Sequence, residues 1–561
     1  MADLSPISGT LGLRRAKHLL RRLTFGYDIA TVNTFAGYNI NTALEQLDLA
    51  PTNAVTFPPL LDWVTNYPSG EDVNDGAFQT QFKSWWLWRM YSDNTALEKL
   101  VFFLHTIITT KQEKVNNSRF LFYQNAMLRR YIVNELTGST DPLSTYKELI
   151  YYMCIENSML RFLDGTLNDV GRPNENFARE LFELFTLGKR ITNIPDDYGT
   201  FTENDIVEAA KVLTGWQTDG DFLTDSDVLL DGANFLKIGK LRTNDNGTLA
   251  SRHDASTKNV FGRTIAPTEV INGRATVESA TEELSTLIDY IFDKREAAEY
   301  IVTRLYRFFV YHTITPEIEN DVIQPLATDF IDGGFRLLPV LRRLLMSRHF
   351  FNDENAEPSG DVDDDNYAVL FKSPIEMTFN VMQFFGNTID EATAYDVMPA
   401  LTRLMEPMNF IFMEPFDVAG YEPYHQSPNF QRNWITTNTL ANRYEFVRTY
   451  LNGEIEMLAP PDLLSFVKDN PEFNSVATTD IDAFVERIVR YLFTLSTRDT
   501  ELTPERLNFF KSELLREGLN AAPLTPEQFW AFQYNNETPD APRMLQALFN
   551  AVLQTPEFQL G

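Results

Sequence analysis

Cysteine is almost absent from this chain, since its 561 residues contain only Cys154. A single thiol excludes an intrachain disulfide framework and a zinc site built on thiolates. The neighbours of Cys154 in "YYMCIENSML" are mostly apolar, which predicts a small buried side chain and not a reactive nucleophile.

Long hydrophobic runs are missing too, because stretches such as "LVFFL" are far too short to span a bilayer. We therefore expect no transmembrane segment.

Positive charge is scarce as well. The chain has 48 Lys and Arg against 78 Asp and Glu, and its formal net charge is -30. A surface of that sign repels phosphate backbones, so we expect no nucleic-acid partner unless basic residues gather locally. The nearest such group is Arg14, Arg15, Lys17, Arg21 and Arg22. Its helical spacing predicts one solvated helix face.

Familiar catalytic and targeting signatures are also lacking. There is no HExxH, GxSxG, P-loop or GxGxxG motif, and nothing that indicates a nucleotide, flavin or haem. No secretory signal is visible, because Arg21 and Arg22 fall where the apolar part of a signal peptide would lie. A cytoplasmic location is the default expectation.

Apolar and aromatic residues are abundant. They make up 43% and 13% of the chain, with 43 Phe, so a large interior is expected. Helical periodicity predicts helices over 79–92, 96–110, 119–137 and 144–162. In "TENDIVEAAKVLTGW", Thr202 suits a helix N-cap and Gly215 its end. The fold class predicted is mostly α: a large multi-helical globular protein.

Changes in this pattern divide the chain into four parts. The predicted parts are an N-terminal helical part at 1–216, an irregular insertion at 217–274, central helices at 275–350 and a C-terminal helical part at 368–561. The insertion should carry minor β structure, because runs such as "NVFGRTI" suit short strands. The acidic segment 352–367 is the candidate boundary within what we expect to be one continuous fold.

The segment "GRPNENFARELFELFTLG", residues 171–188, is the densest motif in the chain. On a helical wheel its apolar residues form one arc, and Glu175, Arg179, Glu180 and Glu183 lie on the other side. The spacing allows Glu175 and Glu183 to pair with Arg179. One interpretation is a solvated salt-bridge face. The other is a face covered by further helices, whose buried carboxylate–guanidinium network orients a ligand or metal. The sequence leaves both open.

Two histidines are the other candidates for chemistry. His105 lies among Phe, Leu and Ile, a setting typical of a core histidine with a satisfied hydrogen bond. His253 precedes Asp254 in "RHDASTK", and with Lys258 these residues suit either a solvated loop or proton transfer and oxyanion stabilisation. His105, His253 and Asp254 are the candidate metal ligands.

A divalent cation such as Ca²⁺ or Zn²⁺ is the one cofactor that the sequence indicates. The run "SGDVDDDNY" and the neighbourhood of Asp219 and Asp221 have the acid density of a structural Ca²⁺ site. Neither has the order of ligands found in an EF-hand.

Several segments together resemble a known family. "GRPNENFARELFELFTLG" followed by "FTENDIVEAAKVLTGW" looks like the signature of the bacterial domain-of-unknown-function family eighteen-hundred. "AKHLLRRLTFG", "EKLVFFLHTIITT", "RHDASTKNVFG", "LYRFFV", "KSPIE" and "TPEFQ" follow the family's order nearly end to end. Many members look exported, and the gene often lies beside one for a protein of the sulfatase-like and phosphatase-like superfamily. The resemblance thus implies an exported or surface-associated protein with such a partner.

The chain departs from the family pattern at two positions. The family often has two histidines one residue apart, of which His105 matches the first while Ile107 stands at the second. Phe185 stands where many members have a further histidine. If those histidines bind metal elsewhere in the family, this chain has lost two ligands, which makes a transition-metal centre less expected here.

Two functions remain as hypotheses. The favoured one is a helical binding or assembly protein that acts with a protein partner, its charged motifs locking helices together. The alternative is a hydrolase or transferase, assisted by a divalent metal, in which side chains from separate helices meet in one cleft. The cleft would contain His105, Glu175, Arg179, Glu180, His253 and Asp254.

Overall fold

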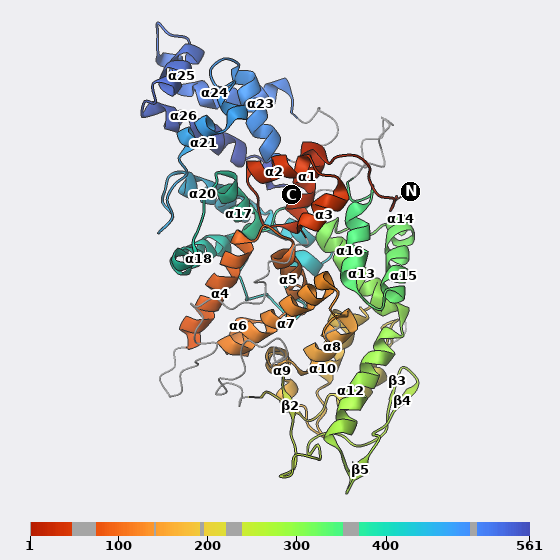
Figure 1. Cartoon of the computed structure of the whole chain (residues 1–561). Coiled ribbons are helices and arrows are strands. Elements are labelled where there is room, and N and C mark those ends of the chain that lie inside the picture. Colours follow the sequence, from red (N-terminus) through yellow and green to blue (C-terminus); the bar gives the residue numbers. More distant parts are fainter. Residues whose placement is uncertain are drawn as a thin grey trace.

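The computed structural model describes residues 2–47, 75–139, 142–190, 196–219, 238–351, 370–493 and 502–561. Helices make up most of this structure, and its β structure is limited to short antiparallel pairs (Figure 1). The mostly α prediction is confirmed. The candidate boundary at 352–367 and the acidic residue Asp221 lie outside the described residues.

The N-terminal helices match the predicted ranges closely. They are α1 (Gly12–Leu23), α2 (Ile29–Ala36), α3 (Ile40–Leu47), α4 (Asp75–Ser92), α5 (Leu97–His105), α6 (Gln112–Val115), α7 (Ser118–Thr137), α8 (Tyr146–Ile155), α9 (Asn157–Phe162), α10 (Glu175–Glu180) and α11 (Glu203–Val212). The helix predicted over 144–162 divides at Glu156, whose backbone is extended and whose carboxylate accepts the first N–H groups of α9. Thr202 caps α11 as predicted, in a capping box with Asp205.

The insertion holds the predicted minor β structure. Its pairs are β1 (Trp216–Gln217) with β2 (Lys240–Leu241), β3 (Lys258–Val260) with β4 (Arg263–Ile265), and β5 (Val270–Ile271) with β6 (Arg274–Ala275). The run "NVFGRTI" supplies parts of β3 and β4, as its alternation suggested. The β3–β4 hairpin contacts α12, so this part of the insertion packs onto the helical body (Figure 1).

Helices resume after the insertion and continue to the C-terminus. The central ones are α12 (Val277–Phe292), α13 (Arg295–Phe309), α14 (Pro316–Ile318), α15 (Gln324–Asp332) and α16 (Leu337–Met346). They are followed by α17 (Pro374–Phe384), α18 (Glu391–Met405), α19 (Glu422–His425), α20 (Thr437–Leu451), α21 (Leu463–Asp469), α22 (Pro471–Asn474), α23 (Ile481–Leu492), α24 (Pro504–Leu515), α25 (Pro526–Asn535) and α26 (Asp540–Leu553). Figure 1 shows α21 and α23–α26 as a lobe at one end of the molecule, which we call the C-terminal lobe.

One hydrophobic cluster extends through the described residues from Ala2 to Phe558. Within the described parts, no helix combines the length and the apolar character needed to cross a membrane. The division into four parts stays a prediction.

The first helix contradicts its prediction. Lys17, Arg21 and Arg22 of α1 are buried, with exposed fractions of 4–8%, although their spacing predicted a solvated face. The helix lies between the C-terminal lobe and the central helices (Figure 1). Lys17 Nζ donates to the Phe493 carbonyl over 2.7 Å. Arg21 donates to the Leu492 carbonyl and to the Tyr27 hydroxyl. Backbone carbonyls of other elements therefore replace the water that the sequence alone would assign to these cations.

A buried ion pair joins α5 to α7. Glu98 and Arg129 are almost fully buried, and the guanidinium binds the carboxylate through both nitrogens, one of them at 2.9 Å. Arg89 from α4 makes a third contact to the same carboxylate at 3.3 Å. This carboxylate thus holds three helices in register.

We expect Glu98→Gln to destabilise the fold by about 3–5 kcal/mol, because it leaves the Arg129 cation buried without its counter-charge. Chemical denaturation of the two proteins measures the difference. The control is Arg403→Gln, which breaks the pair with Glu456 whose side chains are 61% and 76% exposed. It should change stability by no more than about 0.5 kcal/mol, and equal effects of the two variants would contradict the assignment.

Candidate functional site

The segment that carries the densest motif is helical but not uniformly α-helical. Asn174 caps α10 by accepting from the N–H groups of Asn176 and Phe177. After Glu180 the helix widens into a π-helix, η3 (Leu181–Thr186). Most of the predicted apolar arc is buried, while Leu184 is half-buried. A π-helical segment is rare and is often found at functional sites, and nothing in the sequence predicted this one.

Arg179 pairs with a residue that the sequence did not indicate. Its guanidinium binds both carboxylate oxygens of Glu203 on α11, one at 3.0 Å, and also the Tyr198 hydroxyl at 3.2 Å. The predicted pairs with Glu175 and Glu183 are wrong: Glu175 is exposed, and Glu183 lies 3.4 Å from Lys189 Nζ. Because Arg179 and Glu203 are 27% and 33% exposed, the charged face is neither freely solvated nor enclosed.

The pKa of Glu180, within the motif, departs from its ordinary value. Its partial burial and the nearby Glu183 carboxylate raise the pKa of Glu180 to about 7, against the opposing effect of Arg179. Asp417, from the irregular segment before α19, acts in the same direction as Glu183. His425 of α19 has its Nε2 atom 3.9 Å from Asp417. A carboxyl group that titrates near neutrality at the surface is suited to general acid–base chemistry.

Two residues of α13 connect the motif segments. The Tyr300 hydroxyl donates to the Leu184 carbonyl of η3 over 2.7 Å. Arg304 donates to that hydroxyl at 3.3 Å and to the Thr106 carbonyl, just after His105, at 2.9 Å. Gly420, with φ +100°, lies so close to Thr106 that a Cβ atom would be 3.1 Å from the same carbonyl. We call this meeting point of η3, the end of α5 and the 417–425 segment the motif junction.

Sequence reasoning missed Tyr300 and Arg304 at the junction. Arg304 lies on the buried face of the amphipathic helix α13, between Ile301 and Leu305. A charged residue on an otherwise apolar face was the signal that could have revealed it, since such a residue needs buried partners.

His105 is buried beside the motif junction, so its ring is not accessible there as a metal ligand. Its ring packs edge-on against Trp86, with centroids 5.1 Å apart, and its Nε2 atom has no hydrogen-bond partner in the described structure. Burial lowers the pKa of His105 to about 3, so the ring is neutral. Ile107 and Phe185, at the positions of the two missing family histidines, are buried core residues.

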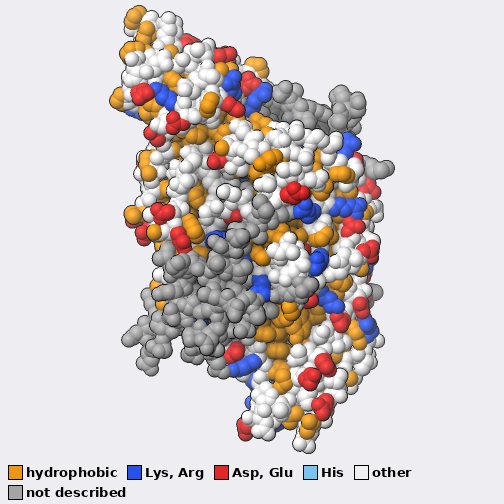
Figure 2. Space-filling view, viewed as in Figure 1, with side chains coloured by type: hydrophobic (Ala, Val, Ile, Leu, Met, Phe, Trp, Pro, Cys, Tyr) orange, Lys and Arg blue, Asp and Glu red, His pale blue; other side chains and the backbone are white. Residues whose placement is uncertain are grey.

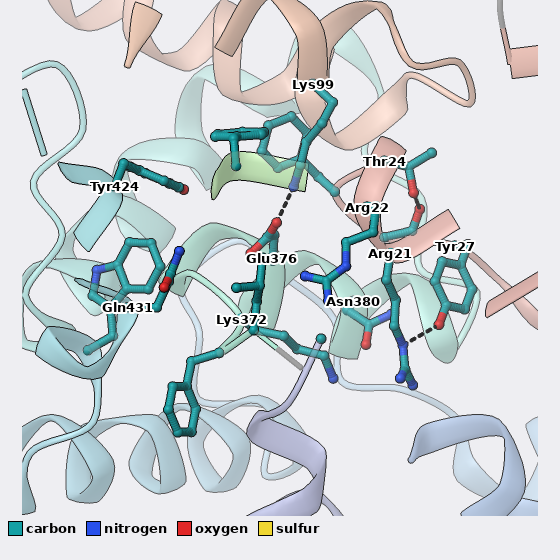
Figure 3. A pocket seen from close by; sticks show the side chains of 17 residues that line it. Arg21, Arg22, Thr24, Tyr27, Lys99, Lys372, Glu376, Asn380, Tyr424 and Gln431 are labelled. Atoms are coloured by element: carbon teal, nitrogen blue, oxygen red, sulfur yellow. Dashed lines mark hydrogen bonds and ion pairs between the residues drawn. The ribbon is translucent and has the colours of Figure 1, made fainter. Parts of the chain in front are cut away.

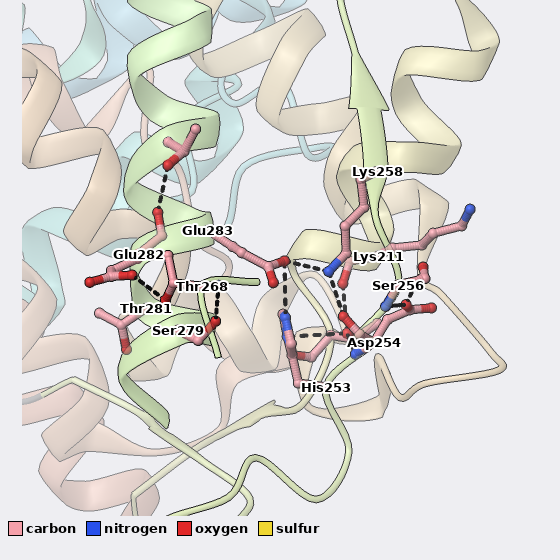
Figure 4. Close-up of polar contacts among 12 residues, drawn as sticks. Lys211, His253, Asp254, Ser256, Lys258, Thr268, Ser279, Thr281, Glu282 and Glu283 are labelled. Carbon is pink, nitrogen blue, oxygen red and sulfur yellow. Dashed lines mark hydrogen bonds and ion pairs between the residues drawn. The ribbon is translucent and has the colours of Figure 1, made fainter. Parts of the chain in front are cut away.

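His253 and Lys258 meet on Glu283 of α12, which the sequence analysis did not consider (Figure 4). The carboxylate of Glu283 binds Lys258 Nζ and lies 3.3 Å from His253 Nε2, while His253 Nδ1 contacts the Thr214 carbonyl at 3.0 Å. The Asp254 carboxylate does not join them, because it accepts from Ser256, but the Asp254 main-chain carbonyl accepts from Lys258 Nζ. The side chains of His253, Lys258 and Glu283 have exposed fractions of 1% or less. The cluster therefore braces the insertion against α12 and is closed to solvent.

The structure does not gather the candidate residues in one cleft. Arg179 and Glu180 are neighbours at the motif junction, and Glu175 points to solvent. Within the described residues, the hydrogen bonds, ion pairs and ring contacts of His105, Arg179 and His253 share no partner. Among the residues that the structure describes, no three His, Cys, Asp or Glu side chains are grouped so as to hold a metal ion.

Comparison with known protein families gives a match over most of the chain. Residues 18–560 match the model of a family described as "Protein of unknown function (DUF1800)". The chain belongs to this family. The match confirms the family resemblance; it begins within α1 and covers the motif junction and the C-terminal lobe. No curated protein and no solved structure shows significant similarity to this DUF1800 chain.

We expect Glu180→Gln to stabilise the protein at pH 8 and to have no effect at pH 4. The raised pKa of about 7, against an ordinary 4.5, means that the folded chain retains this proton when the unfolded chain has lost it. Stability therefore falls as pH rises from 4.5 to 7, and the variant removes that loss, about 1 kcal/mol after allowance for solvent screening. Thermal unfolding at a series of pH values measures it. Glu175→Gln, at the exposed end of α10, is the control, and the same pH profile in both variants would contradict the prediction.

The two charged clusters should differ in their contribution to stability. Arg179→Ala breaks a partly exposed pair and should cost about 1 kcal/mol. Lys258→Ala leaves Glu283 buried without its cation and should cost about 3–5 kcal/mol. Denaturation of both variants under one set of conditions gives the comparison. A larger loss for Arg179→Ala would mean that the motif helix, and not the insertion, carries the enclosed network.

Proposed function

We propose that this DUF1800 protein is a helical binding or assembly protein that acts with a protein partner through its C-terminal lobe. The supporting observation is a concentration of exposed apolar side chains. Of eleven large hydrophobic side chains exposed in the described residues, four lie between positions 509 and 532, with exposed fractions of 41–70%. They are Phe509 of α24, Leu519 and Leu524 of the connection, and Phe532 of α25.

These four residues, called here the lobe surface, belong to elements in mutual contact at the end of the molecule. Figure 2 shows hydrophobic side chains exposed on this lobe at the top of the view. Aromatic side chains in the open are typical of binding surfaces, because their burial on association contributes much of the binding energy.

Charge favours a partner that differs from this chain. Glu517 and Glu527 are exposed near the lobe surface, and the whole chain carries a net charge of -30. A second copy would bring like charges together, whereas an apolar face bordered by Lys and Arg complements the lobe surface. The family resemblance suggests a protein of the sulfatase-like and phosphatase-like superfamily as the first candidate, and an exported or surface-associated setting for the complex.

The test is co-expression of the full chain with that candidate, followed by size-exclusion chromatography with light scattering and titration of the purified proteins. Phe509→Ser with Phe532→Ser should weaken the complex about tenfold or more, because both aromatic anchors are removed. The control is Leu167→Ser, which removes a side chain 70% exposed outside the C-terminal lobe and should leave the affinity unchanged.

Equal affinity of the double variant and the wild type would contradict the proposal, and so would a protein that stays monomeric with the candidate present. A concentration-dependent dimer of the chain alone would replace the proposed partner with a second copy.

Glu180 supports a second candidate function, an acid–base hydrolase or transferase at the motif junction. The supporting observation is its pKa of about 7 at a partly exposed position, with Asp417 and Glu183 close enough to raise it. A divalent cation, if one takes part, would meet these carboxylates. The Glu180→Gln and Glu175→Gln variants serve here too: an activity of the wild type lost only in the first would support the enzyme.

A further inference from the structure

A polar pocket with a volume of about 280 Å³ lies between the first helices and the connection from α17 to α18. Three segments line it: the start of α2, the end of α4 with the residues after it, and the end of α17 with the loop that follows. Its lining residues lie within 27–31, 91–94 and 383–389. None of them belongs to the motif junction or to the lobe surface. We call this hollow the polar pocket.

Neutral polar side chains dominate the lining. Five of its residues carry a hydroxyl group and three carry a side-chain amide, whereas Asp28 carries the one charge. No Lys, Arg or His of the described residues lines it. Phosphate, sulfate and carboxylate ligands are held by such side chains, so the polar pocket does not suit an anion. The N-terminus of α2 offers no substitute, because Asp28 itself accepts from the Thr31 N–H group at 2.7 Å.

Several polar groups of the lining make no hydrogen bond to another described residue. They include the hydroxyl groups of Thr31 and Thr388 and the amide of Asn94. Asp28 uses its Oδ1 atom in the helix cap, which leaves Oδ2. Asn387 uses its amide nitrogen, which leaves its amide oxygen. A hydroxyl or an amide both donates and accepts, and a carboxylate accepts, so the set suits a ligand that does both at several points.

Hydrogen bonds to main-chain carbonyls hold two walls of the polar pocket together. The Tyr91 hydroxyl donates to the Asn387 carbonyl at 2.6 Å, and the Gln383 amide donates to the Tyr91 carbonyl. Trp88 Nε1 donates to the Ile389 carbonyl at 2.9 Å. The end of α4 is thereby fixed against the loop after α17. A binding site whose walls are already in place loses less conformational entropy when a ligand binds.

Two tyrosines give the lining a rigid aromatic part. Tyr27 and Tyr91 line the polar pocket, although only 8% and 3% of their surface is exposed. Arg21 Nε donates to the Tyr27 hydroxyl at 2.8 Å, a contact drawn in Figure 3. Both rings are packed into the fold, so they do not turn to fill the hollow. An apolar ring beside polar groups suits a ligand with both C–H and O–H surfaces.

We propose that the polar pocket binds one ring of a neutral saccharide. The hydroxyl groups of a sugar donate and accept, as the unpaired groups of the lining require, and its C–H groups suit the tyrosine rings. The volume of about 280 Å³ is close to the lower end, roughly 300 Å³, of the range for ligand sites. One sugar ring has this size, whereas a buried oligosaccharide or nucleotide exceeds it. The site is independent of the protein partner proposed above.

The experiment is saturation-transfer NMR of the full chain with D-glucose, D-galactose, D-mannose and N-acetyl-D-glucosamine, followed by calorimetric titration. At least one of these sugars should bind saturably. Its affinity should be the same at low and high sodium chloride, because salt screens only interactions between charges.

Three variants locate the bound sugar. Asp28→Asn keeps a helix-capping side chain but loses the charge, so it should weaken binding about tenfold. Asp480→Asn, the same exchange at the N-cap of α23, is the matched control and should leave the affinity unchanged. Thr388→Trp should abolish binding because the indole occupies the polar pocket. Thr388 is exposed, so the folded chain accommodates the larger side chain.

Failure of all four sugars to bind would overturn the proposal. Binding that persists in both Asp28→Asn and Thr388→Trp would also overturn it, because the sugar would then occupy another surface. Putrescine that binds, and that is displaced by sodium chloride, while no sugar binds would assign the polar pocket to a cationic amine instead. None of these outcomes depends on the partner of the lobe surface.

Discussion

The cations of α1 hold the two ends of this molecule together. Lys17 and Arg21 donate to carbonyls at the end of α23 in the C-terminal lobe, and His18 bonds the Phe350 carbonyl at 2.9 Å on the other side. A helix near the start of the chain is thereby fixed between segments more than 300 residues away. Because a buried cation is costly without partners, the lobe and α1 constrain each other's position.

The charged motifs of the chain have two different physical roles. His253 and Lys258 meet Glu283 in a closed cluster that attaches the insertion to α12. The motif helix instead carries Glu180 at the motif junction, where this side chain is partly exposed and its pKa is raised to about 7. A dense charged motif is thus no sign of one shared site. In this protein, burial separates the residues that brace the fold from those that remain available for chemistry or binding.

Local features were predicted well where neighbours in sequence determine them. Thr202 caps α11, as its position predicted, in a capping box with Asp205 three residues on. The break at Glu156 was missed, because the apolar pattern of 144–162 continues across it and only the extended backbone reveals the new cap. The pairs of Arg179 were missed because Glu203 lies on another helix, beyond any i,i+4 rule.

The sequence by itself determined the class of the fold, the start of helices such as α11, the β3–β4 hairpin and the family, since periodicity, capping residues and motifs are local properties. Only the tertiary structure decided which charges are buried. The spacing of the cations on α1 is that of a solvent face, and α23 and Phe350 exclude water from it. Glu283 and Arg304 likewise acquired their roles from helices distant in sequence. The environment of a charge depends on what packs against it, and no helical pattern specifies that partner.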